Sequence, residues 1–213
     1  MTKARGATLR HPPFTIVLPA GWSRIPIGPG SRPAIKRILD AAVDRTDDPR
    51  AVQVRRRLEQ MLTAQVRAAQ EQSGVELYLP TAQVHGITVP ASVVVSAPKP
   101  EAGTDPTEVL LAVAARRKGA AVLDIGGKPA VRTERLVAPP REVDAYDGAP
   151  PPSRQVVYFL ADPDDDRRYL VVSASVLVGE GEGPAAVADA VTELVDAMLT
   201  TFRWLDVDTP EEP

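Results

Sequence analysis

Apolar side chains recur with helical spacing in three long stretches of the chain, at i, i+3, i+4 and i+7. The stripes are Ile35, Ile38, Leu39, Ala42 and Val43; Val54, Leu58, Met61, Leu62, Val66 and Ala69; and Val187, Val191, Leu194, Val195, Met198, Leu199 and Phe202. The first two predict a pair of helices within residues 33–72. Asp47-Asp48-Pro49 separates them, with aspartate as a cap and proline at the first position of the second helix. The third stripe predicts a terminal helix over 187–202.

A further helix is predicted over 106–118 from the residues at its ends. Asp105 fits the N-cap, and Glu108 lies at the third helical position. The stretch closes on Arg116-Arg117-Lys118-Gly119, which places cations at the negative end of the helix dipole and a glycine stop after them.

Runs of β-branched and apolar residues predict strands between these helices. Residues 14–27 predict a strand pair that opens the fold, formed by a short strand, a turn around Pro19-Ala-Gly21 and a second strand or edge segment. Further strands are expected at 75–79, 83–89, 92–97, 121–125, 128–137, 155–161 and 169–178. Gly126-Gly127 and the run from Asp162 to Asp166 are the expected hairpin turns.

The length of 213 residues predicts one domain with elaborations. We expect a flexible N-terminus over 1–13, a single domain over 14–205 with a helical insertion near 33–72, and an acidic tail over 206–213. Proline is about twice as frequent as usual, with 22 residues. Several of these prolines mark residues 138–153 as a long proline-rich loop, which is unusual in a compact domain.

Three short motifs resemble one fold group. They are the opening Phe14-Thr-Ile-Val-Leu-Pro-Ala-Gly-Trp22, the glycine hairpin Leu123-Asp-Ile-Gly-Gly-Lys-Pro-Ala-Val-Arg132, and the closing Thr201-Phe-Arg-Trp204. Together with the element order they resemble the Mog1/PsbP-like group, which includes PsbP, Mog1, actinobacterial LpqN-type proteins and DcrB-like toxin chaperones. The resemblance implies an α+β fold, an antiparallel β-sheet flanked by helices as an α/β/α sandwich. It also implies protein binding without catalysis.

The chain departs from the lipoprotein branch of that group. It contains no lipobox cysteine, and its N-terminus has basic residues but no apolar segment of the kind found in signal peptides. No apolar run approaches the ~18 residues of a membrane span. A cytoplasmic location is therefore expected. The helices of 33–72 and the loop of 138–153 also set the chain apart from compact members.

Composition excludes several chemistries. With no cysteine, the chain has no disulfide, no thiolate nucleophile and no thiolate metal site. A net charge of −3 and an aromatic content of 4% disfavour nucleic acid as a partner, because they offer neither a basic field nor stacking surface. His11 and His85 are the only histidines and lie far apart in sequence, so no zinc set or Ser–His–acid triad is indicated.

Two loop motifs are incomplete. Gly179-Glu-Gly-Glu-Gly183 lies between a strand and a helix, but proline stands at 184 and two glutamates would repel a phosphate. Asp162, Asp164 and Asp166 begin like a calcium loop, but the sixth position is Arg167 and the twelfth Ser173. We therefore expect no catalytic residue, metal or cofactor site.

Candidate partner-binding residues are Trp22, Arg55, Arg56 and Trp204. Arg55-Arg56-Arg57 is the densest basic run, although consecutive residues of a helix point in different directions, which is typical of a solvated flank. The two tryptophans and Phe202 are rare large aromatics at the two ends of the domain. They either close the core or, in one case, anchor a partner.

The first functional hypothesis is a non-enzymatic protein-binding adaptor or chaperone, in line with a secretion-related role in the resembled group. Its partner is another protein of unknown identity, and homo-oligomerisation is left open. One alternative is a carrier of an apolar small molecule or cargo helix, which a sizeable apolar cleft would favour. The other is an enzyme that uses carboxylates, which a buried, mutually close carboxylate pair in a cleft would favour.

Overall fold

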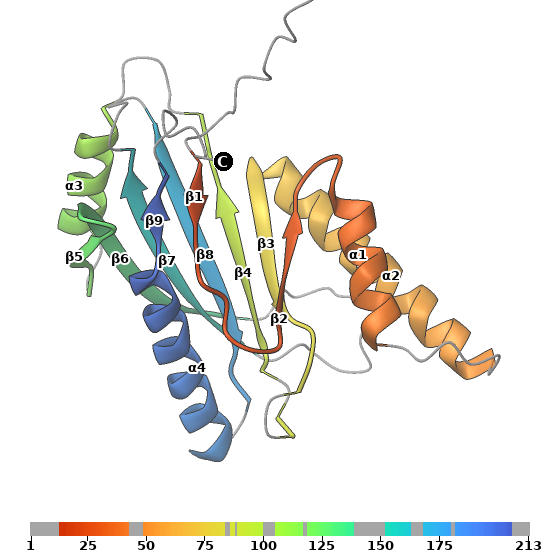
Figure 1. Cartoon of the computed structure of the whole chain (residues 1–213). Coiled ribbons are helices and arrows are strands. Elements are labelled where there is room, and N and C mark those ends of the chain that lie inside the picture. Colours follow the sequence, from red (N-terminus) through yellow and green to blue (C-terminus); the bar gives the residue numbers. More distant parts are fainter. Residues whose placement is uncertain are drawn as a thin grey trace, which may run out of the picture.

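A seven-stranded antiparallel sheet forms the centre of the protein in the computed structural model, with strand order β2-β3-β4-β8-β7-β6-β5 (Figure 1). The structure describes residues 13–42, 49–83, 86–87, 89–99, 105–116, 119–138, 152–162, 168–179 and 182–205. The strands of the sheet are β2 (Trp22–Pro26), β3 (Gly74–Pro80), β4 (Ala91–Ser96), β5 (Ala121–Ile125), β6 (Lys128–Val137), β7 (Ser153–Ala161) and β8 (Tyr169–Leu177). The expected α+β class, an antiparallel sheet flanked by helices, is confirmed.

Four helices and a separate two-stranded ribbon complete the described part of the chain. The helices are α1 (Ser31–Ala42), α2 (Pro49–Glu71), α3 (Pro106–Arg116) and α4 (Glu182–Thr200). The ribbon pairs β1 (Phe14–Thr15) with β9 (Arg203–Trp204), so the first and last strands of the domain lie side by side (Figure 1).

Successive side chains of each strand point to opposite faces of the sheet, and each face has its own core. On one face, here the α4 face, α4 and the β1–β9 ribbon cover Tyr78, Val93, Val95, Val156, Tyr158, Leu160, Leu170, Val172 and Ala174. The ribbon adds a stack of Phe14 on Phe202, with ring centroids 5.5 Å apart, and Trp204 meets Phe202 edge to face at 4.9 Å. This face is sealed by aromatic and aliphatic side chains.

On the other face, here the α1–α2 face, the helices cover only part of the sheet. Ile35, Leu39 and Val66 of α1 and α2 pack on Ile25, Leu77 and Leu79. α3 contacts β6 and β7, where Val131 and Thr133 are buried on the face away from α4. Between these helices lies a row of polar residues that are opposite one another across four strands: Ser92, Ser175, Gln155 and Arg135.

Most element positions agree with the sequence predictions. The β5–β6 hairpin has the predicted bounds, and its glycines Gly126 and Gly127 have positive φ of 63° and 76°, as a tight turn requires. Helix α2 begins at Pro49 and ends at Glu71, where Ser73 adopts a positive φ of 59° before β3.

Four expectations need correction. The described residues of 83–89 form no strand, since Ile87 makes only an isolated bridge. The two segments of 14–27 do not pair with each other, because β1 joins β9 and β2 joins β3. Val54 and Met61 are exposed rather than buried, since the N-terminal half of α2 extends beyond the sheet (Figure 1). Helix α4 begins at 182 and ends at 200, and the strand β9 that follows it was not predicted.

Several sequence features lie outside the described residues. These are the segment 1–12, both histidines, Asp164 and Asp166, residues 139–151 of the proline-rich loop and the tail from 206.

Candidate functional site

An apolar groove of about 550 Å³ opens on the α1–α2 face. Its walls are the two helices, and its floor is formed by the ends of β3, β4 and β8. The described lining residues are Ile38, Leu39, Ala42, Leu58, Leu62, Gln65, Leu79, Pro80, Thr81, Val89, Pro90, Ala91, Ser92, Ser175 and Leu177. The volume lies in the range of small-molecule sites.

The groove exists because α2 approaches the sheet at only one end. Near its C-terminus Val66 and Ala69 are buried, whereas Leu58 and Leu62, earlier in the same stripe, are only half-buried. The helix therefore leaves a widening gap above Ser92 and Ser175, which face the gap from paired positions on β4 and β8. A wedge of this shape holds apolar walls with a few hydroxyl groups at its base.

No charged residue lines this groove among the described residues. Its polar groups are Gln65, Thr81, Ser92 and Ser175, whose side chains are neutral. The groove thus offers apolar burial with four neutral hydrogen-bonding side chains, and it contains no acid or base among them for proton transfer.

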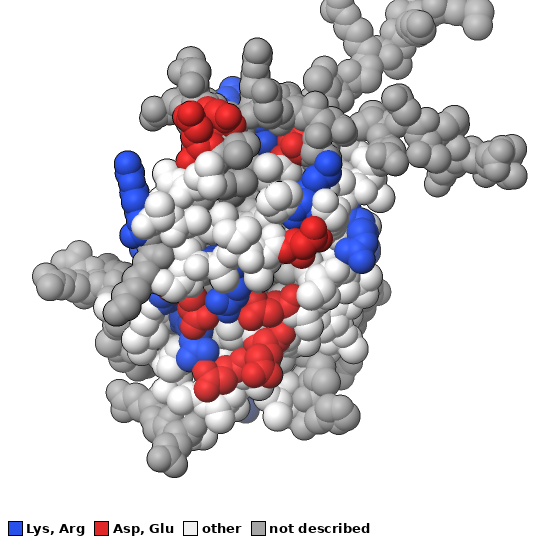
Figure 2. All heavy atoms as spheres, turned by 90° about the vertical axis from the view of Figure 1, so that its left-hand side faces the viewer, with Lys and Arg blue, Asp and Glu red and all other residues white. Residues whose placement is uncertain are grey.

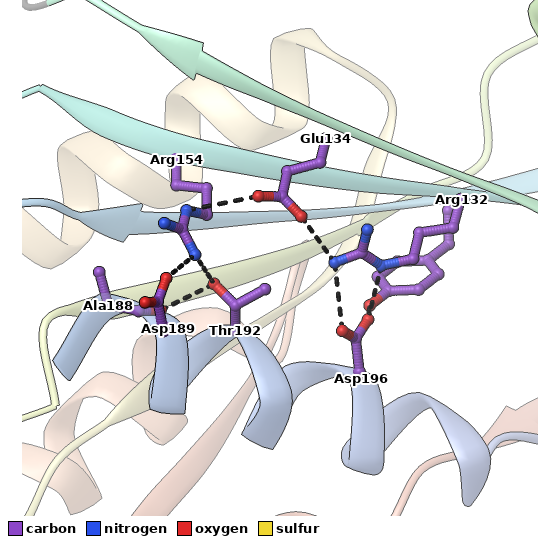
Figure 3. Close-up of polar contacts among 8 residues, drawn as sticks. Arg132, Glu134, Arg154, Ala188, Asp189, Thr192 and Asp196 are labelled. Carbon is purple, nitrogen blue, oxygen red and sulfur yellow. Dashed lines mark hydrogen bonds and ion pairs between the residues drawn. The ribbon is translucent and has the colours of Figure 1, made fainter. Parts of the chain in front are cut away.

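A network of charged residues joins α4 to β6 and β7 on the opposite face (Figure 3). Arg132 binds Asp196 in a bidentate manner, through Nε to Oδ1 at 2.7 Å and Nη2 to Oδ2 at 3.1 Å, and also contacts Glu134 at 2.9 Å. Arg154 bridges Glu134 at 3.4 Å and Asp189 at 2.6 Å. Three carboxylates and two guanidinium groups therefore form one chain of ion pairs.

Hydroxyl groups complete this network. Tyr158 donates a hydrogen bond to Asp196, and Thr192 donates one to the carbonyl oxygen of Ala188 at 2.8 Å. Burial, together with the hydrogen bond to Asp196, raises the pKa of Tyr158 above its usual value. Burial lowers the pKa of Arg132, but the bonds to Asp196 and Glu134 outweigh burial and raise this pKa above its usual value. Both groups are thereby kept in their neutral-pH states, which suits docking of α4 better than proton transfer.

Figure 2 shows acidic and basic side chains lying together on the lower half of this side of the molecule. Helix α4 itself contains no lysine or arginine, so the cations come from the strands. Arg132 and Arg154 lie at core-facing positions of β6 and β7, where they neutralise the acidic flank of α4. The paired groups are structural partners of one another.

A second polar cluster lies in the core at the opposite edge. Glu76 is buried on β3, where Tyr78 and Arg24 each donate a hydrogen bond to its carboxylate. Burial first, and then the bond to Glu76, raise the pKa of Tyr78. An enzyme using carboxylates would need two of them close together in a cleft. Here the buried carboxylate of Glu76 is satisfied by a phenol and a guanidinium group.

The predicted tryptophans belong to the core of the α4 face. Trp22 begins β2 and Trp204 lies in β9, and both are half-buried against that core. This agrees with the interpretation that they close the core. Their role in partner binding stays a prediction.

The two predicted arginines lie on different sides of α2. Arg55 turns toward α1 and pairs with Asp40 at 2.6 Å, while Asp40 also accepts a bond from Lys36 at 2.8 Å. These bonds lower the pKa of Asp40 to about 2. Arg56 is exposed beside Glu59 and Arg67. The structure therefore does not bring Arg55 and Arg56 together with either tryptophan.

The remaining motifs have structural roles where they are described. Asp162 is buried and pairs with Arg168 at 3.0 Å. Glu182 and Gly183 open α4. No group of three or more potential metal ligands occurs among the described residues, and none of their helices is long and apolar enough to cross a membrane.

Sequence reasoning missed the groove and the ionic network. The sequence does contain a pattern that indicates the network. Ala130, Arg132 and Glu134 share one face of a strand, and Asp189 and Asp196 lie seven residues apart beside the apolar stripe of α4. No sequence pattern indicates the groove, because the groove depends on the angle at which α2 leaves the sheet.

Comparisons with known proteins concern the fold. No protein-family model matches the chain, and no curated protein sequence matches it. Among solved structures, LpqN of Mycobacterium tuberculosis, described as involved in cell envelope biogenesis, is 11% identical with a TM-score of 0.48, covering 92% of this chain and 84% of that one. The Ran-binding protein Mog1p of Saccharomyces cerevisiae is 13% identical with a TM-score of 0.44, covering 91% and 90%. The α+β architecture that the sequence motifs imply is the one observed in the described residues.

Proposed function

We propose that the protein is a non-enzymatic binding protein that holds an apolar ligand in the groove between α1, α2 and the sheet. The observation that carries the proposal is the groove itself, about 550 Å³ in volume and lined on three sides by aliphatic side chains and prolines. A sizeable apolar cleft of this kind favours the carrier hypothesis.

The energetic argument rests on the half-buried walls. Ile38, Leu58 and Leu62 each leave part of an apolar side chain in water. Covering such surface is favourable by roughly 25 cal/mol per Å². The hydroxyl groups of Ser92 and Ser175 at the floor orient a ligand without demanding a charge on the inserted part.

Binding of a neutral fluorescent probe, N-phenyl-1-naphthylamine, tests the proposal. We expect saturable binding by the full chain, with a blue-shifted emission. Ala42→Trp places an indole in the groove from an exposed position of α1 and should weaken probe binding at least tenfold. Ala68→Trp is the matched control, because Ala68 is exposed on α2 outside the groove. Equal binding by both variants, or no saturable binding by the natural chain, contradicts the proposal.

A second candidate function, the protein-binding adaptor, is favoured by the β5 edge. β5 is the last strand of the sheet, and among the described strands it pairs with β6 alone. Its Val122 and Leu123 are exposed, at 68% and 37%. An open edge with exposed aliphatic residues is a site where an extended segment of another protein adds a strand.

Substitution at this edge distinguishes the adaptor from the carrier. Val122→Lys should abolish capture of a stoichiometric protein partner, while Leu136→Lys, equally exposed but on the inner strand β6, should retain it. Retention by both variants contradicts edge docking. The secretion-related role, the cytoplasmic location and homo-oligomerisation stay predictions.

A further inference from the structure

A second cavity adjoins the apolar groove on the other side of α1. It has a volume of about 570 Å³, and its described lining residues are Ser23, Arg24, Pro26, Ala34, Arg37, Ile38, Ala41, Thr81 and Ala82. Ile38 and Thr81 line both cavities. The two cavities are therefore neighbours that share these two wall residues, near the end of β3.

The two cavities differ in charge. The apolar groove has no charged lining residue among those described, whereas the second cavity has two arginines and no acidic residue. The guanidinium group of Arg24 is already bonded to the buried Glu76. Arg37 is exposed and makes no ion pair or hydrogen bond with the described residues. The site thus combines an apolar space with one adjacent cation that no described residue engages.

We propose that the ligand is a single-chain amphiphile with an anionic head, a long-chain alkyl carboxylate, whose chain lies in the apolar groove and whose carboxylate pairs with Arg37. This inference rests on the proposed function, because it names the class of ligand that the groove holds. A guanidinium group binds a carboxylate with two parallel hydrogen bonds, which fixes the position of the head. Each methylene group of the chain that enters the groove tightens binding roughly fourfold.

Arg135 provides a matched control for Arg37. It is also exposed and lies on the same face, at the far end of the polar row, but its Nε donates to Gln155 at 2.7 Å and it lines neither cavity. Arg37→Gln and Arg135→Gln remove the same charge from the protein. Only the first removes it from the site.

Calorimetric titration of the full chain with dodecanoate, octanoate and the neutral dodecanol, below their aggregation concentrations, tests the inference. We expect dodecanoate to bind roughly tenfold more tightly than dodecanol, and octanoate to bind much more weakly than dodecanoate. Arg37→Gln should erase the preference for the carboxylate and leave dodecanol binding unchanged. Arg135→Gln should retain the preference.

The possible results separate the two proposals. Equal affinity for dodecanoate and dodecanol in the natural chain, or equal effects of the two arginine variants, contradicts the inference that the ligand has an anionic head. The proposal that the groove binds an apolar ligand is unaffected by either result. Absence of binding by both dodecanol and the neutral naphthylamine probe overturns the proposed function and the inference with it. Circular dichroism of the two variants checks that each retains the fold, which is expected because both arginines are exposed.

Discussion

The two faces of the sheet are built on different principles. On the α4 face, valines of the sheet pack with Tyr78 and Tyr158 beneath α4. The β1–β9 ribbon covers one end of this core, and the ion pairs of Arg132 and Arg154 with α4 close its flank. On the α1–α2 face, the helices pack tightly only near β2 and β3 and leave the groove open. A single sheet thus carries a closed core on one side and a bounded apolar space on the other. The closed core and the groove that we propose as the binding site therefore lie on different faces.

Truncation of one large side chain on each face gives the largest predicted difference. Phe202→Ala removes the ring that contacts both Phe14 and Trp204, so we expect a loss of about 3–5 kcal/mol in the free energy of unfolding. Leu58→Ala on the groove wall should cost roughly 1–2 kcal/mol, because Leu58 is already half in water. Urea denaturation measures both. Similar losses would show that the groove face is as closely packed as the α4 face.

Predictability from sequence differs between the faces in the same way. The α4 face follows from periodicity, since the strand alternation and the α4 stripe place Val156, Val172 and Val195 in the core. Turn chemistry fixes the Gly126-Gly127 hairpin, whose glycines supply the positive φ that it needs. The packing of the α1–α2 face cannot be predicted from periodicity, because the apolar stripe of α2 has the same period along its length whether or not the sheet lies beneath it.

The ends of the chain show a related limit. The β1–β9 pairing joins residues about 190 positions apart, from Phe14 to Trp204, and two-residue strands have no pattern of their own. Their aromatic residues were visible in the sequence, but their contact is a property of the assembled sheet. The groove was not predicted for a similar reason, because the candidate residues were selected by rarity, whereas the groove is lined by common aliphatic residues.

Breaking the ionic flank of the α4 face tests how that face is closed. Arg132→Met removes the bidentate partner of Asp196 and one partner of Glu134, so we expect a loss of about 1–3 kcal/mol in the free energy of unfolding. Arg135→Met, on the same strand but outside the network, should change it by less than about 0.5 kcal/mol. Chemical denaturation compares the two. If Arg132→Met has no larger effect than Arg135→Met, α4 is held by apolar packing alone.

The buried phenol groups of the α4 face predict that the protein loses folding stability at alkaline pH. Burial and hydrogen bonds to carboxylates raise the pKa of Tyr78 and Tyr158 in the folded protein above the ordinary value of 10.0. The folded state therefore keeps protons that the unfolded state releases, and stability should fall as the pH rises above about 10. Tyr158→Phe should lower the free energy of unfolding by about 1 kcal/mol at neutral pH, because the hydrogen bond to Asp196 is lost. The same substitution should reduce the loss of stability above about pH 10.

Tyr169 serves as the control for this pH dependence. Burial also raises its pKa, but it makes no hydrogen bond to a carboxylate among the described residues. Tyr169→Phe should therefore leave more of the alkaline loss in place than Tyr158→Phe does. Denaturation midpoints between about pH 8 and pH 11 give the comparison. An equal change in both variants would mean that burial alone, and not the bonded carboxylate, sets the alkaline limit.

The smallest predicted effect lies on the α1–α2 face, where Asp40 of α1 is linked to α2 by Arg55 and also pairs with Lys36 within α1. These partners lower the pKa of Asp40 to about 2 from the ordinary 3.8. A lowered pKa means that the contribution of Asp40 to stability is fully present above about pH 4 and is lost as the pH falls toward 2. Asp40→Asn should therefore weaken the protein slightly at neutral pH and low salt, and the difference should shrink in acid and at high salt, since exposed ion pairs are screened.

The same substitution connects stability to the groove. Arg55 and Asp40 hold α2 against α1 beside Leu39 and Leu58, two of the groove-lining residues. Loss of the pair should let the walls separate, so Asp40→Asn is expected to lower the affinity for the neutral probe by a few fold while the urea midpoint barely moves. Arg24→Gln offers the opposite test, because Arg24 bonds to Glu76 in the closed core and should affect stability more than probe affinity. If Asp40→Asn leaves probe affinity unchanged, the groove walls are positioned by the buried contacts of Ile35, Leu39 and Val66 and not by the ion pair.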